Sequence, residues 1–113
     1  MDYYKTLYEA TAYLLMLQVQ MREYPFSTVV SRYLEENAFA DSRERAVESV
    51  AVLLALDRNG EPMRAEIIDR LEQSLAGLKI GDFPETARAG IEADLKTAKT
   101  VIEWYRTTEE KIR

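Results

Sequence analysis

Apolar residues recur at helical spacing along most of this chain, and helix-breaking residues divide the pattern into five segments. No segment shows the sustained alternation of apolar and polar residues that is typical of a half-buried strand. The clearest seam lies in the first segment, where apolar positions follow a 4-3-4-3-4 spacing at Tyr3, Leu7, Ala10, Leu14, Leu17 and Met21. The pattern therefore predicts an all-α protein.

The breakers set the expected ends of the helices. They lie at Tyr24-Pro25 and at residues 37–41, 57–60 and 77–84. Asp41 stands three residues before an acid, as in a capping box, while Pro62 suits a first turn and Gly77 a C-terminal cap. We expect helices over residues 2–23, 28–37, 42–57, 62–77 and 84–110. Because the connections are short, residues 1–113 should form a single-domain antiparallel bundle of four to five helices.

Two features inside these segments bear on packing. Residues 50–56 are continuously apolar, which suits a buried strand as well as a buried helix. Their unbroken join to the helix-forming run at residues 43–46 favours a buried helix. Gly90 interrupts the last helix at a cost of about 1 kcal/mol relative to alanine, so we expect another helix to pack closely there.

The composition removes most enzyme chemistry. The 113 residues include no cysteine and no histidine, which excludes disulfides, thiolate nucleophiles, zinc fingers, Ser-His-Asp triads and imidazole ligands. Fifteen basic and twenty acidic side chains give a net charge of −5, opposite in sign to the basic face of a nucleic-acid-binding protein. We therefore predict a non-enzymatic protein with no catalytic residue, no cofactor, no metal site and no nucleic-acid partner.

The N-terminal sequence shows no sign of export or membrane insertion. Met1-Asp2-Tyr3-Tyr4 carries an acid where a signal peptide has basic residues. The apolar run at residues 12–17 is too short to span a bilayer. The absence of cysteine suits a reducing compartment. These features predict a cytoplasmic protein that has no membrane partner.

The first segment carries most of the candidate binding residues. It is apolar nearly all round from residue 12 to residue 21, as in a helix at the centre of a bundle or one that contacts a second chain. The seam is broadened by Tyr4, Tyr8, Leu15 and Val19. These residues belong either to a wide intramolecular core or to a surface that binds a partner, and both interpretations remain open. Tyrosine is enriched at interfaces because its ring is apolar and its hydroxyl is polar. The candidate partner-binding residues are Tyr4, Tyr8, Tyr13, Met16, Glu35, Glu36 and Trp104.

These residues favour a small acidic helical module that binds a protein and acts by occluding it. Such a module could be an inhibitor, an immunity protein, an antitoxin or an adaptor. Its tyrosine and leucine surface would supply affinity, while Glu35 and Glu36 would steer a basic target. Trp104 would add a second contact site, because tryptophan is enriched at binding hot spots. A homodimer remains open as well.

Two other functions remain open. The carboxylate pairs that could hold a divalent metal ion across the bundle are Glu44 with Glu48 and Glu66 with Asp69. They resemble the acidic pairs on adjacent helices of helical nucleotide pyrophosphohydrolases, which implies a metal-dependent hydrolase, although here arginines interleave with the acids. Residues 50–71 have the apolar spacing of a helix-turn-helix, although the segment that follows is acidic where a recognition helix should begin.

Overall fold

Five α-helices and one short 3-10 turn make up most of the structure. The computed structural model describes residues 2–112. Its elements are α1 (Tyr3–Gln20), α2 (Phe26–Glu36), α3 (Ser42–Asn59), α4 (Ala65–Leu75), η1 (Ile80–Asp82) and α5 (Glu85–Ile112). No strand occurs in the described residues. The prediction of an all-α helical bundle is confirmed.

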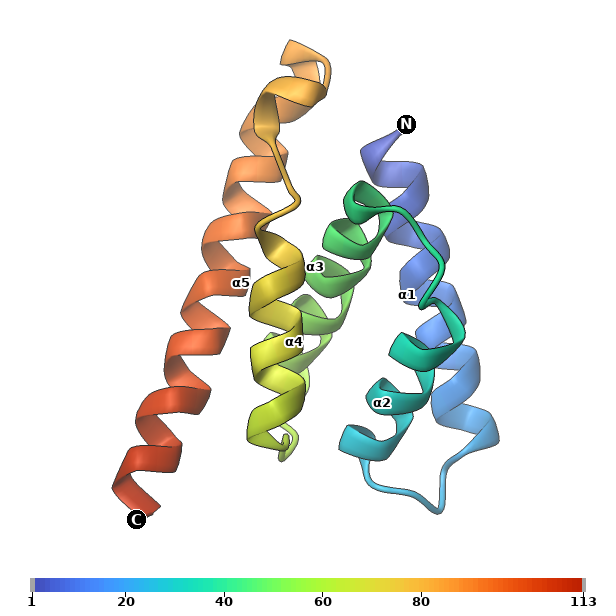
Figure 1. The fold of residues 1–113 in the computed structure, drawn as a ribbon, viewed down its shortest axis with the longest axis vertical. Helices are drawn as coiled ribbons and strands as arrows, with labels where there is room; N and C mark the ends of the chain where they lie inside the picture. Colours follow the sequence, from blue (N-terminus) through green and yellow to red (C-terminus); the bar gives the residue numbers. More distant parts are fainter. Residues whose placement is uncertain (1, 113) are drawn as a thin grey trace.

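Successive α-helices run in opposite directions, and α3 lies between the others (Figure 1). α1, α3 and α5 point one way, and α2 and α4 point the other way. α1, α4 and α5 pack directly on α3, while α2 packs against α1 and α4. Because α1 and α5 flank α3, they are the edge helices of the bundle.

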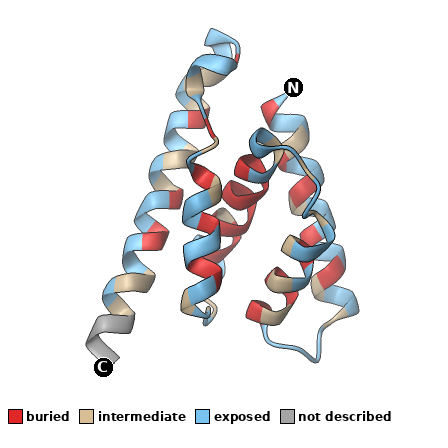
Figure 2. Cartoon of the chain, viewed as in Figure 1, coloured by how far each residue is buried: buried red, intermediate tan, exposed pale blue. Residues whose placement is uncertain are grey.

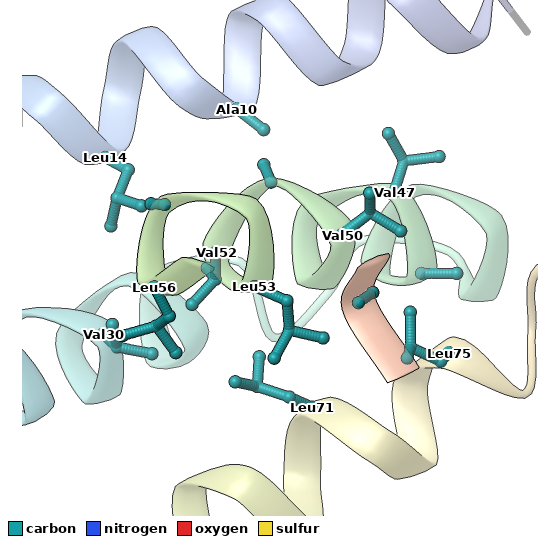
Figure 3. Close-up of a cluster of buried hydrophobic side chains, with 14 of the residues drawn as sticks. Ala10, Leu14, Val30, Val47, Val50, Val52, Leu53, Leu56, Leu71 and Leu75 are labelled. Carbon is teal, nitrogen blue, oxygen red and sulfur yellow. The ribbon is translucent and has the colours of Figure 1, made fainter. Parts of the chain in front are cut away.

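The sequence of α3 explains its central place. Every residue from Ala46 to Leu53 is buried, and Figure 2 shows buried residues along the length of this helix. Leu53 lies toward Leu71 of α4, and Leu56 lies toward Val30 of α2 (Figure 3). Fully burying one such aliphatic side chain contributes about 1.5–3 kcal/mol to stability. The continuously apolar run at residues 50–56 is therefore a buried helix, as predicted.

Pro25 determines the connection between α1 and α2. α1 ends at Gln20 rather than at residue 23, and the Tyr24 N–H donates to the Met21 carbonyl at 2.9 Å in the turn that follows. A residue that precedes proline disfavours helical dihedral angles, so Tyr24 cannot continue the helix into α2. Pro25 then caps α2, which begins at Phe26 rather than at residue 28.

Both ends of α3 follow from the residue types that cap it. The Asp41 carboxylate accepts a hydrogen bond from the Glu44 N–H at 2.9 Å, which confirms the predicted N-terminal cap. At the other end Gly60 has a φ of 59°, in the left-handed region, and its N–H donates to the Leu56 carbonyl. α3 extends past the predicted residue 57 to Asn59 because this glycine is the residue that ends it.

The predicted start of the fourth helix is wrong. α4 begins at Ala65 after a segment that is not helical, so Pro62 lies outside its first turn. The Arg64 N–H, at the cap of α4, donates to Ser27 Oγ of α2 at 3.1 Å. This contact between residues distant in sequence sets the start of α4, overriding the local preference of proline.

The predicted end of the fourth helix is wrong as well. α4 ends at Leu75, and Ala76 rather than Gly77 is its cap. Gly77 allows a close approach instead, because a Cβ at this position would lie 2.7 Å from the Ser42 carbonyl oxygen at the start of α3. The glycine at position 77 is therefore explained by helix packing and not by helix termination.

α5 and the residues just before it contact the N-terminal end of α1. The Tyr3 hydroxyl donates to Asp94 Oδ2 at 2.8 Å, and the Tyr3 ring packs edge-on against Phe83 with centroids 5.7 Å apart. The Tyr4 hydroxyl occupies the space that a side chain at position 90 would need. The expected close packing at Gly90 is confirmed, and the neighbour there is α1.

Leu53 and Leu15 provide a matched test of this arrangement. Leu53 is fully buried on α3, whereas Leu15 is mostly exposed on α1. We expect Leu53→Ala to lower the free energy of unfolding by about 2–5 kcal/mol because it leaves a cavity, and Leu15→Ala to lower it by about 0.5 kcal/mol or less. Urea unfolding followed by circular dichroism measures both values. Equal losses would contradict the surface position of Leu15.

Candidate protein interface

α1 has a second apolar side that the other helices do not cover. Its inward side buries Tyr3, Leu7, Ala10, Leu14 and Leu17. Tyr8, Leu15 and Val19 are 68%, 56% and 70% exposed. With Tyr4 they recur at intervals of 4, 7 and 4 residues and so share one side of the helix. We call Tyr4, Tyr8, Leu15 and Val19 the α1 stripe.

The exposed side of α1 is uncharged as well as apolar. No charged residue occurs between Glu9 and Arg22, although 31% of the chain is charged. Ala12, Met16 and Gln20 are also exposed in this interval. A contiguous exposed apolar surface that lacks charges is typical of a site that binds another protein.

A second uncharged stripe runs along α5. The α1 stripe meets α5 where the Tyr4 hydroxyl lies against Gly90. Gly90, Thr97 and Trp104 recur every seven residues, about two helical turns, so Trp104 lies on the same side of α5 as this contact. We call the uncharged residues of that side the α5 stripe: Thr86, Ala93, Thr97, Thr100 and Trp104. The α1 stripe and the α5 stripe touch at Tyr4 and Gly90 and otherwise lie on helices that flank α3; together we call them the uncharged face.

Two hollows adjoin the uncharged face near the turn between α3 and α4. One has a volume of about 440 Å³, and its lining includes Leu15 as well as the charged residues Arg22 and Glu61. The other has a volume of about 270 Å³, and its lining includes Trp104 and the charged residue Asp57. The Trp104 side chain is 53% exposed and packs edge-on against Tyr105, with ring centroids 4.8 Å apart. Hollows beside exposed aromatic rings are suited to receive a partner's side chains.

Tyr13 and Glu36, two of the predicted binding residues, bond to each other. The Tyr13 hydroxyl donates to the Glu36 carboxylate, which also accepts a hydrogen bond from Arg32 Nε at 3.1 Å. The bond to Glu36 raises the pKa of Tyr13, and the same bond, aided by Arg32, lowers the pKa of Glu36. Tyr13 lies about 200° around α1 from Leu15, so this pair faces α2 and not the uncharged face.

The other predicted residues divide between these two regions. Tyr4, Tyr8 and Trp104 belong to the uncharged face, and Met16 lies on the exposed side of α1 beside it. Glu35 is exposed near the end of α2. The structure therefore gathers Tyr4, Tyr8 and Met16 on the exposed side of α1 and adds Trp104 from α5. It directs Tyr13 toward α2, which carries the two acids.

Leu15 and Val19 broaden the apolar seam in the sequence, and both are exposed in the structure. The reason is the position of α1 at the edge of the bundle, where only one side of the helix has neighbours. The spacing in the sequence already separates these residues from the core, because the 4-7-4 spacing of the α1 stripe defines a side of the helix distinct from that of the 4-3-4-3-4 seam.

The carboxylates of the hydrolase alternative do not come together. On α4, Glu66 pairs with Arg64 at 3.9 Å, and Asp69 pairs with Arg106 at 2.9 Å. Within the described part of the chain, no three Asp or Glu side chains form a group that could hold a metal ion. Glu66 and Asp69 thus form separate surface ion pairs, one with the N-cap residue of α4 and one with α5.

Glu48 differs from the other carboxylates because it is buried. Its side chain is only 8% exposed, and Oε2 accepts no hydrogen bond from any residue that the structure describes. Burial, together with the nearby Glu44 carboxylate, raises the pKa of Glu48 to about 7, while Arg45 acts in the opposite direction. An unpaired carboxylate in this position destabilises the fold whenever it is charged.

Comparisons of the chain with protein-family models, with curated proteins and with solved structures found no match. None of the helices among residues 2–112 combines the length and the hydropathy that crossing a bilayer requires. The candidate interface is therefore defined by its own geometry: two uncharged stripes, two hollows and an exposed tryptophan.

The buried carboxyl group should make stability depend on pH. Glu48 titrates near pH 7 in the folded protein and near its ordinary value of 4.5 in the unfolded chain. Because the unfolded chain loses this proton first, stability should fall as the pH rises from about 4.5 to about 7 and then level off. We expect Glu48→Gln to remove a fall on the order of 2 kcal/mol between roughly pH 5 and pH 8, measured by urea unfolding.

The chain is well suited to this measurement because no histidine titrates in the same range. Glu66→Gln is the matched control, since Glu66 is exposed and should leave the pH dependence unchanged. A wild-type stability that rises across this range, or a fall that persists in Glu48→Gln, would show that Glu48 is not its source.

Proposed function

We propose that this chain is a protein-binding module and that the uncharged face is the surface with which it binds. The proposal rests on the exposure of Tyr8, Leu15 and Val19 on a helix whose opposite side already contributes its share of the core. These side chains are not needed to complete the bundle. Their contact with water is unfavourable in the isolated chain, and a partner that covered them would remove that contact.

The side chains of the two stripes carry no charge, so burying them supplies affinity at no cost for desolvating a charge of their own. Fully burying an aliphatic or aromatic side chain of this kind contributes about 1.5–3 kcal/mol, so a few such residues are enough for specific binding. Tryptophan and tyrosine are the residues most often found at binding hot spots, and the face holds Trp104, Tyr4 and Tyr8. Such a module acts by occlusion, because it covers an apolar surface of its partner.

Charges outside the face favour a partner with basic residues at its rim. The chain has a net charge of −5, and Glu35 and Glu36 lie on α2 beside α1. Long-range attraction would therefore speed association with a basic protein. Two copies of this acidic chain repel each other at a distance, but the uncharged face is a surface through which they could meet without placing like charges in contact.

The double variant Leu15→Asp and Val19→Asp tests the proposal. Both positions are exposed, so the variant should fold like the wild type. Two carboxylates at the centre of a buried interface should weaken binding by about 100-fold or more. Capture from the native host with wild type and variant identifies proteins that depend on the face, and titration of each purified protein gives its Kd. Sedimentation equilibrium of the pure chain tests self-association in the same way.

Phe39→Asp is the control, because it also replaces an exposed apolar side chain by a charge, but in the connection between α2 and α3. It should bind like the wild type. Trp104 is the only tryptophan in the chain, so its fluorescence emission should move to shorter wavelengths when a partner covers the face. The proposal fails if the pure chain is monomeric and the double variant retains every protein that the wild type captures.

A further inference from the structure

A pocket of about 360 Å³ lies between α1, α2 and α3. Three carboxylates line it, one from α1 and two from α3: Glu9, Glu44 and Glu48. Neither lysine nor arginine is among its lining residues. We call it the acidic pocket, because carboxylates that are gathered in a concave site with protein walls concentrate negative potential there.

Glu48 is the buried carboxylate of this pocket. Its Oε2 is shielded from solvent and has no hydrogen-bond donor among the described residues. Buried polar atoms in native structures almost always have a partner, from the protein, from water or from a ligand. Glu48 also lines a neighbouring pocket of about 370 Å³ that contains Arg45 and Arg70, so the acidic pocket is the side of Glu48 on which no basic residue lies. A ligand N–H group in the acidic pocket could supply the donor that the helices do not provide once the Glu48 side chain turns Oε2 toward it.

Two tyrosine rings also line the acidic pocket. The rings of Tyr13 and Tyr33 are tilted at 48° to each other, with centroids 5.7 Å apart. The face of a tyrosine ring attracts a cation that lies within about 6 Å of its centre. Asn37, whose side-chain amide donates to the Tyr33 carbonyl at 2.8 Å, adds an amide oxygen to the lining. Carboxylates, ring faces and an amide oxygen all favour a positively charged donor.

The separation of the carboxylates suits a cation larger than a metal ion. Ca²⁺ and Mg²⁺ need several oxygens at about 2.0–2.6 Å from one point. No three Asp or Glu side chains within the described residues come together in that way. Alkylammonium and guanidinium groups carry several N–H donors, so they can bond to oxygens on different walls of a pocket.

We propose that the acidic pocket binds an organic cation, an alkylammonium or guanidinium group that donates to Glu48 and lies against the exposed ring of Tyr13. The pocket lies on the α2 side of α1, away from the uncharged face, and the proposal is independent of the function proposed above. A free polyamine and a lysine or arginine side chain of another protein both present this chemistry.

Isothermal titration calorimetry with spermidine as the probe tests the site. The wild type should bind one spermidine per chain at neutral pH and moderate salt. Glu48→Gln keeps the shape of the side chain but removes its charge, so it should weaken binding about tenfold or more. This variant should remain folded, because the substitution removes an unpaired buried charge.

Glu66→Gln is the matched control, since it removes one negative charge from the exposed surface of α4. Its affinity for spermidine should stay within about twofold of the wild type, because exposed charges are strongly screened. Equal weakening in both variants would mean general attraction to an acidic chain and would overturn the proposal. Binding of Mg²⁺ that depends on Glu48, without binding of spermidine, would also overturn it.

Proton release gives a readout that a purely structural role of Glu48 would not produce. The charged and titratable groups around Glu48 are Glu9 and Tyr13 on α1, Tyr33 on α2, Asp41, Glu44 and Arg45 at the start of α3, and Arg70 on α4. A cation beside the Glu48 carboxyl lowers its pKa, so binding near pH 7 should release about half a proton. The binding heat of the wild type should then depend on the ionisation enthalpy of the buffer, and that of Glu48→Gln should not.

Nα-acetyl-lysine amide and Nα-acetyl-arginine amide, whose side chains keep their charge, distinguish the sources of the cation. If spermidine binds more tightly than both capped residues, the result supports the site and indicates a free polyamine as its ligand. Capped residues that bind as tightly as spermidine support the site and indicate a side chain of a protein. If spermidine and both capped residues fail to bind, the acidic pocket is not a site for organic cations.

Discussion

The arrangement of the helices depends on the need to bury α3 on every side. Its residues from position 46 to position 53 are buried in succession, so no side of the helix can face water. A single neighbour covers only one side of a helix, and burial all round therefore requires several neighbours. α1, α4 and α5 provide most of this cover, and Leu56 extends the core toward Val30 of α2. The antiparallel order of the bundle follows because short connections place consecutive helices side by side.

Because one side of α1 covers α3, two other sides of α1 remain available for binding. One side presents the α1 stripe to solvent, and on the α2 side Tyr13 lines the acidic pocket together with Glu48 of α3. The α1 stripe would bind through the removal of apolar area from water, and the acidic pocket through charge and hydrogen bonding. The chain thus carries two candidate sites of different chemistry on opposite sides of one helix.

The sequence predicted the helices well and their packing less well. The run at residues 50–56, the Asp41 cap and the close packing at Gly90 all followed from local signals, and the structure confirms them. The ends of α4 did not, because Arg64 at its start bonds to Ser27 of α2, and Gly77 serves the close approach to Ser42 of α3 and not the end of the helix. A proline or a glycine marks a break in a helix, but contacts between distant residues decide what that break does.

Of the candidate site, the sequence alone determined the residue types: a tyrosine-rich and charge-free first helix, a single tryptophan and an acidic net charge. A period of 3.6 residues fixes which side chains share a side of a helix, and it can be read without a structure. Only the tertiary structure decided which side of α1 is covered, that Leu15 and Val19 are exposed, and that Glu48 is buried without a partner. The physical reason is that burial is a property of neighbours from distant parts of the chain, and helical periodicity carries no information about where those neighbours lie.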